Sequence, residues 1–122
     1  MTQRRTVSSG SEYESFVGYS RAVRTGPHIA VAGTTGAGDD IATQARDALR
    51  RIDIALQEAG GSLSDVVRTR MFVTDIARWE AIGRAHGEFF RDIRPVTSMI
   101  EVARLISPEM LVEIEADAFC AG

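Results

Sequence analysis

Few residues of this 122-residue sequence have side chains suited to catalysis, and they form no complete catalytic motif. His28 and His86 are the only histidines, and Cys120 is the only cysteine. One cysteine excludes an intrachain disulfide and a cysteine-rich metal cluster, and an isolated histidine cannot make a metal site. Ser98 has no histidine or lysine at a spacing that would activate it as a nucleophile. We therefore expect neither a metal nor a cofactor.

A row of acidic residues near the C-terminus is the strongest charged pattern. Glu113, Glu115 and Asp117 alternate with apolar residues in the segment LVEIEADAF. Two neighbouring carboxylates can perform acid–base chemistry. Alternatively, most of the row pairs with Arg68 and Arg70 across a sheet or an interface, because unpaired buried charge is costly. The sequence favours the second interpretation.

The segment VAGTTGAGDD resembles a nucleotide-binding turn, since it is a glycine-rich loop between an expected strand and an expected helix. Its glycine spacing does not fit the dinucleotide fingerprint. Asp39 and Asp40 would also repel phosphate at the start of the helix. We expect a plain loop, with one of these aspartates as the N-cap.

The periodicity of apolar residues predicts two helices and six strands. The first helix begins at Ile41 and ends at Gly60-Gly61, and the second runs through IARWEAIGRAHGEFF until Pro95 stops it. The apolar stripe of the second helix comprises Ile76, Trp79, Ile82, His86, Phe89 and Phe90. The expected strands lie near residues 6–7, 19–24, 28–32, 65–75, 96–104 and 111–119, and Gly26-Pro27 close a hairpin between the second and the third.

The resulting order is β-β-β-α-β-α-β-β, with one face of the sheet covered by two helices. In DVVRTRMFVTD, Val67, Thr69, Met71 and Val73 are expected on one face. The opposite face of the sheet is expected to carry Arg68, Arg70, Phe72, Met99, Glu101, Glu113, Glu115, Asp117 and Phe119. Such rows of charged and aromatic residues are more typical of a sheet face that contacts another protein than of one exposed to solvent, so we expect a homo-oligomer.

The bulk properties are those of an ordinary globular protein with a single domain over residues 1–122. The hydrophobic fraction is 44%, the charged fraction is 25% and the formal net charge is −3. This acidic balance argues against a nucleic-acid partner. The sequence shows no signal peptide and no apolar run long enough for a membrane span, so a cytoplasmic location is expected.

Several segments together resemble the RidA/YjgF family over nearly the whole chain. They are GYSRAV, IAVAGTTG, IATQARDALRRIDIALQEAGGSLSDVVRTRMFVTD and EVARL followed by LVEIEADA. The resemblance implies a chorismate-mutase-like α+β fold and a homotrimer around a central β-barrel. It also implies hydrolysis of reactive enamines and imines, such as 2-aminoacrylate, in clefts between subunits.

The resemblance is weakest in RPVTSMIEVARL, where deaminases of the family carry an arginine that binds the substrate carboxylate. Here Thr97 occupies that position, and Met99 replaces a cysteine common in the family. Ala32 and Gly83 replace a serine and an asparagine of the cleft. The cleft is therefore expected to lack its usual carboxylate clamp.

Other features of the family site are retained. The resemblance implies that Tyr19 and Glu113 position and activate a water molecule. Thr97, Ser98, Met99 and the backbone at Gly33 and Thr34 are then expected to contact a small-molecule ligand.

Arg21 stands where deaminases more often have glutamine. It either restores a positive charge to the cleft or forms an ion pair with Glu12, Glu14 or an acid of a neighbouring chain. Two functions follow: a hydrolase or deaminase acting on a small enamine, imine or amide, or a non-catalytic trimer that binds metabolites in the same clefts. The family is also linked to ribonuclease activity, which the acidic composition disfavours here.

Overall fold

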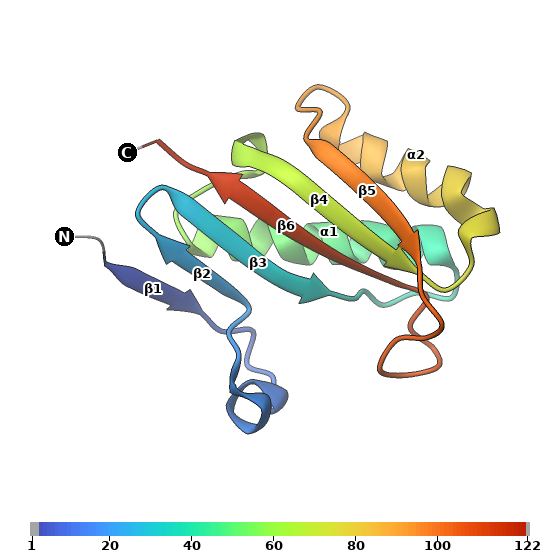
Figure 1. Ribbon diagram of the computed structural model, residues 1–122, viewed down its shortest axis with the longest axis horizontal. Helices are drawn as coiled ribbons and strands as arrows, with labels where there is room; N and C mark the ends of the chain where they lie inside the picture. Colours follow the sequence, from blue (N-terminus) through green and yellow to red (C-terminus); the bar gives the residue numbers. More distant parts are fainter. Residues whose placement is uncertain (1–2, 122) are drawn as a thin grey trace.

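The computed structural model describes residues 3–121, which form one sheet and two main helices (Figure 1). The strands are β1 (Arg4–Val7), β2 (Ala22–Thr25), β3 (His28–Thr34), β4 (Val66–Val73), β5 (Val96–Glu101) and β6 (Val112–Phe119). The helices are α1 (Ile41–Glu58) and α2 (Trp79–Phe90), with short helical turns at Glu14–Gly18, Leu63–Asp65 and Ile76–Arg78. The expected α+β class is confirmed.

The six strands are ordered β1-β2-β3-β6-β4-β5 in a single sheet. Only β4 and β5 pair in parallel, and α2 makes the connection between them. The other neighbours are antiparallel, and β6 lies in the middle between β3 and β4. This order brings the acidic row of β6 beside the arginines of β4 and beside the end of β3.

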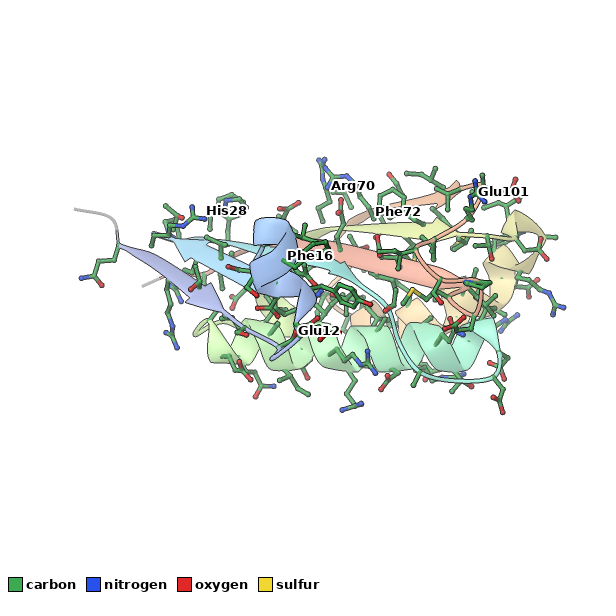
Figure 2. The ribbon with its side chains drawn as sticks, turned by 90° about the horizontal axis from the view of Figure 1, so that it is seen from below. Glu12, Phe16, His28, Arg70, Phe72 and Glu101 are labelled. Atoms are coloured by element: carbon green, nitrogen blue, oxygen red, sulfur yellow. The ribbon has the colours of Figure 1, made fainter. Side chains whose placement is uncertain are left out.

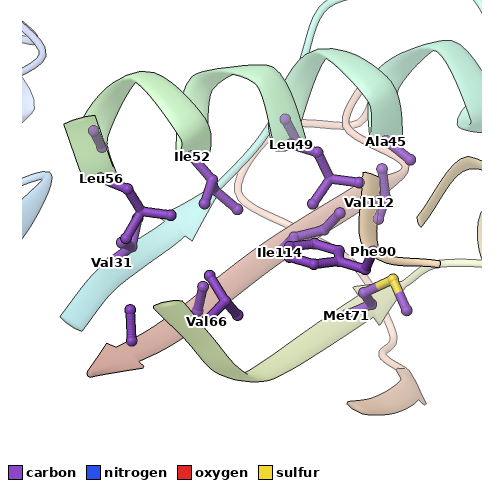
Figure 3. Close-up of a cluster of buried hydrophobic side chains, with 14 of the residues drawn as sticks. Val31, Ala45, Leu49, Ile52, Leu56, Val66, Met71, Phe90, Val112 and Ile114 are labelled. Carbon is purple, nitrogen blue, oxygen red and sulfur yellow. The ribbon is translucent and has the colours of Figure 1, made fainter. Parts of the chain in front are cut away.

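Helix α1 forms where its sequence pattern predicts it. Asp40 caps it by accepting a hydrogen bond from the Thr43 backbone N–H at 2.8 Å. Leu49, Ile52 and Leu56 point from α1 onto the sheet, where they are completely buried (Figure 3). These residues pack against Ile114 and other apolar residues of the sheet and form the core. This packing holds α1 against β3 and β6.

Replacing Leu49 by alanine is expected to lower the free energy of unfolding by about 2–5 kcal/mol, because it leaves a cavity in a closed core. Chemical denaturation measures this change. Ile54 on the same helix is 45% exposed, so Ile54→Ala serves as the control and should cost clearly less. Equal losses for the two variants would contradict the packing described.

Two expected stripes are shifted by local irregularities. Val66 rather than Val67 is buried at the start of β4, because the register with β6 shifts between Val66 and Arg68. The second helix was expected to start at Ile76, but a 3₁₀ turn capped by Asp75 precedes α2. Consequently Ile76 is 39% and Trp79 58% exposed, and the expectation that they share the buried stripe was wrong.

The sheet face away from the helices carries the paired charges (Figure 2). Arg70 binds Glu115 at 2.9 Å and lies 3.6 Å from Asp117, so the expected pairing across β4 and β6 is confirmed for Arg70; Arg68 forms no ion pair among the described residues. Met99 and Glu101 do not belong to this face. Their neighbours across β4 are Met71 and Val73, which face the helices, and the Glu101 carboxylate accepts the Ile76 backbone N–H at 3.0 Å.

Smaller differences concern the N-terminal segment and the chain end. The π-helical turn Glu14–Gly18 was not predicted, and β2 starts at Ala22 rather than near Tyr19. Cys120 follows β6 instead of lying within it. Among residues 3–121, no helix has the length and apolar composition required to cross a membrane.

Candidate functional site

A large cavity of about 1050 Å³ lies where the N-terminal segment, the end of β3, helix α1 and the loop before β6 meet. Its polar lining includes Tyr19, Arg21, Gly33, Thr34 and Glu113. These are five of the eight residues that the sequence analysis assigned to the site. Because four come from the N-terminal half and Glu113 from β6, the pairing of β3 with β6 is what brings them together.

Glu113 is one of three acidic residues that line this cavity, with Glu58 and Glu109, and it is the one that lies over Gly33. Its carboxylate lies over Gly33, where an added Cβ would stand only 2.6 Å from Oε2. Partial burial raises the pKa of Glu113 above its ordinary value; the nearby Glu115 raises this pKa further, while Arg21 lowers it. A larger residue at position 33 would displace the carboxylate from this position.

Arg21 is held at the irregular end of β3. Its Nη1 donates to the Gly33 carbonyl at 2.8 Å and to Thr34 Oγ1 at 2.9 Å. The pairing of β3 with β6 shifts between Val31 and Thr34, and this bulge turns the Gly33 carbonyl out of the ladder. Gly33 thus contacts both charged groups, with the carboxylate above its Cα and the guanidinium on its carbonyl.

The expected ion pair of Arg21 with Glu12 or Glu14 does not occur in the part of the chain that the structure describes. Glu14 instead accepts hydrogen bonds from the backbone and hydroxyl of Ser9, which lower its pKa. Arg21 also lies over the Tyr19 ring, with Cζ 5.8 Å from the ring centroid. Only Nη1 of Arg21 has hydrogen-bond partners among these residues, so Nε and Nη2 remain available.

Arg21 and Glu113 share the cavity without forming an ion pair within 4 Å in the described structure. The packing around Gly33 holds an acid and a cation apart, and a polar ligand fits between two such groups. The cavity is also lined by Tyr13, Val17 and Ile106, which were not predicted from the sequence. No periodic pattern marks these residues, because they lie in irregular segments.

Thr97, Ser98 and Met99 lie away from this cavity. Thr97 lines a second, smaller pocket of about 330 Å³ between the end of α2 and the start of β5. Met99 packs against the core, and Ser98 is exposed. Within one chain, the expected ligand-binding strand and the expected catalytic pair are therefore separate. No group of three or more His, Cys, Asp or Glu side chains in residues 3–121 is placed to hold a metal.

Comparison with known proteins identifies the family. The family model described as Endoribonuclease L-PSP matches residues 10–120. The crystal structure of Rv2704 from Mycobacterium tuberculosis, described as a member of the YjgF/YER057c/UK114 family, is 68% identical with a TM-score of 0.95, and the match covers 96% of this chain and 99% of that chain. The chain therefore belongs to the RidA/YjgF family.

Two further relatives have full-length similarity. The uncharacterized protein SCO2049 of Streptomyces coelicolor is 34% identical over 122 residues, covering 94% of this chain and 91% of its own. The 2-iminobutanoate/2-iminopropanoate deaminase of Salmonella typhimurium is 33% identical over 110 residues, and the match covers 87% of this chain and 85% of the deaminase. The relatives thus include a deaminase by name, and the family model is named for a ribonuclease.

Proposed function

We propose that this protein is a small-molecule hydrolase of the deaminase type, which acts on a reactive enamine, imine or amide. The reaction takes place in clefts between the subunits of a homotrimer. Each cleft combines the Glu113 cavity of one subunit with the strand bearing Thr97, Ser98 and Met99 of the next. The separation of these two groups within one chain supports a site shared between chains.

Glu113 carries this proposal. Its carboxylate lies over Gly33 in the cavity, and its pKa is raised, chiefly by burial. A carboxylate in such surroundings is a better general base near neutral pH than an exposed one. It accepts a proton from water as the oxygen bonds to the C=N carbon. That proton passes to the nitrogen, which gives a carbon bearing both a hydroxyl and an amine. Glu113 then takes the hydroxyl proton as the C=O bond forms and the C–N bond breaks, and it returns this proton to the leaving nitrogen, so that an imine gives a carbonyl compound and ammonia.

The other cavity residues bind and orient. Tyr19 places its hydroxyl-bearing ring against Arg21, and the available nitrogens of Arg21 can bind a ligand oxygen. Thr34 and the Gly33 carbonyl are engaged by Arg21, so they shape the cavity through this arginine. The acidic composition disfavours nucleic acid, and we do not propose ribonuclease activity.

A second function, binding without catalysis, is favoured by Thr97. Its hydroxyl contacts Thr69 Oγ1 at 2.9 Å and the Pro95 carbonyl at 3.2 Å, and no cationic side chain replaces the family arginine on this strand. A site without the arginine that binds the carboxylate in the deaminases can still retain a metabolite without turning it over.

Ammonia release separates the two functions. A panel of imines, enamines and small amides is incubated with wild type, Glu113→Ala and, as the control, Glu80→Ala on the exposed face of α2. A hydrolase should act on at least one compound, lose this activity in Glu113→Ala and keep it in Glu80→Ala. Binding of a compound without ammonia release would favour the non-catalytic function, and activity that survives Glu113→Ala would exclude Glu113 as the base.

The homotrimer is a separate prediction. The sheet face that the helices leave open carries Phe72 and, 53% exposed, Phe119 beside the Arg70 ion pairs. An obligate interface over such a face should bury more than roughly 2,000 Å². Light scattering at micromolar concentration is expected to give the mass of three chains. A monomer would contradict both the assembly and the shared cleft.

A further inference from the structure

The smaller pocket contains a buried chain of hydrogen bonds that the proposed reaction does not use. His86 Nε2 lies 2.9 Å from Thr69 Oγ1, which lies 2.9 Å from Thr97 Oγ1. Thr97 Oγ1 is in turn 3.2 Å from the Pro95 carbonyl oxygen. His86 and Thr69 are buried, whereas Thr97 is exposed at the mouth of the pocket.

Counting protons fixes the direction of this chain. The Pro95 carbonyl can only accept, so Thr97 must donate its single hydroxyl proton to it. Thr97 then accepts from Thr69, and Thr69 has no second proton, so it accepts from His86 Nε2–H. All three contacts are hydrogen bonds only in this arrangement, which leaves Nδ1 of a neutral His86 as a lone-pair acceptor.

His86 lines the pocket, and its Nδ1 atom keeps some exposed surface. In the described residues, no buried side-chain nitrogen or oxygen lacks a hydrogen-bond partner. Nδ1 has no partner among the hydrogen bonds of His86, so it is not fully buried, and His86 lines this pocket. Burial lowers the pKa of His86, which keeps the ring neutral, and the Phe90 ring lies against it, tilted by 34°, with ring centroids 4.7 Å apart.

The pocket therefore offers two acceptors and no proton from its hydrogen-bond chain. The acceptors are His86 Nδ1 and the remaining lone pair of Thr97 Oγ1. The charged donors that line the pocket are Arg91 and Arg94, and Arg94 already uses its Nε to donate to the Arg91 carbonyl at 3.0 Å. Arg94 is the one non-glycine residue of the described chain with positive φ, 58°.

We infer that this pocket binds a primary carboxamide, where deaminases of the family bind a carboxylate. The amide NH₂ donates to His86 Nδ1 and Thr97 Oγ1, and the amide oxygen accepts from Arg94. A carboxylate could also bind Arg94. Its oxygens would then face the lone pairs of His86 Nδ1 and Thr97 Oγ1 with no proton available for a hydrogen bond. The inference rests on the proposed function in one respect, the assignment of the Thr97 strand to the ligand cleft.

Calorimetry with two nearly isosteric ligands tests this inference. Pyruvamide and pyruvate differ in the NH₂ group and the charge, and both resemble the carbonyl product of imine hydrolysis. Wild type is expected to bind pyruvamide at least about 10-fold more tightly, because a site built for a donor discriminates against a ligand that lacks it. Pyruvate binding as tight as pyruvamide binding, or no binding of either ligand, would overturn the inference.

Variants assign the preference to the two acceptors. Thr97→Val and His86→Gln should each reduce the ratio of the two affinities, while Thr97→Ser keeps the hydroxyl and should preserve it. Arg94→Gln should weaken the binding of both ligands. Arg84→Gln, on the exposed face of α2, should leave both affinities unchanged. An unchanged ratio in a folded Thr97→Val would also overturn the inference. These measurements need no turnover, so they stand apart from the ammonia assay.

Discussion

Glu113→Gln is expected to reduce hydrolysis of the preferred substrate by about 10²–10⁴-fold in kcat, the usual contribution of a general base. Glutamine keeps the size of the side chain over Gly33, so the cavity should keep its shape. KM should change far less than kcat, because the base acts on water rather than on the substrate. Steady-state ammonia release on the substrate found in the panel measures both.

The control for this variant is Glu115→Gln on the same strand. Glu115 binds Arg70 on the sheet face, away from the Gly33 contact. The Glu115→Gln variant should retain most of the activity. Its pH profile should shift modestly to lower pH, because the charge of Glu115 raises the pKa of Glu113 in the wild type. A loss in Glu115→Gln as large as that in Glu113→Gln would show that the sheet charges, and not one base, support the activity.

Deamination of 2-aminoacrylate should be slow in this protein. Loss of a bidentate, charge-assisted pair to the substrate carboxylate removes a few kcal/mol of binding, which is on the order of 10²-fold or more in kcat/KM. Thr97 cannot replace this pair, because its only proton is donated to the Pro95 carbonyl. The comparison is made with an arginine-bearing relative under the same conditions.

Equal kcat/KM values for the two proteins would contradict the account of position 97. Thr97→Arg provides a partial control, since it restores the guanidinium. Ala32 and Gly83 also differ from the deaminases, so full recovery is not expected from this substitution alone. Added affinity for pyruvate in Thr97→Arg would still show that position 97 faces the ligand.

The elements that follow a regular period could be predicted from the sequence. The stripe of α1 and the alternation of β6 depend only on which residues face the core, and both have the expected faces. The start of β4 and the start of α2 were misplaced because a bulge and a 3₁₀ turn shift the period by one residue. Such irregularities are decided by pairing with β6 and by the Asp75 cap, which composition does not reveal.

The site was predicted less completely than the fold. The family resemblance identified Glu113, Tyr19 and Gly33, and the structure brings all three to one cavity. Two other features depend on residues far apart in the sequence. They are the hydrogen bond from Arg21 to the Gly33 carbonyl and the hydrogen bonds that link His86, Thr69 and Thr97. Only the packed structure brings these residues together, so no motif could have identified them.

The pH dependence of kcat/KM tests the role of Glu113 most directly. The base must be deprotonated to act, so activity should fall as pH falls through the pKa of Glu113. Because burial raises this pKa above its ordinary value near 4.5, the acid limb of the wild-type profile should lie above that value. In Glu113→Gln, the residual activity should lack this limb. An acid limb that persists unchanged in Glu113→Gln would show that another group is the base and would contradict the proposed mechanism.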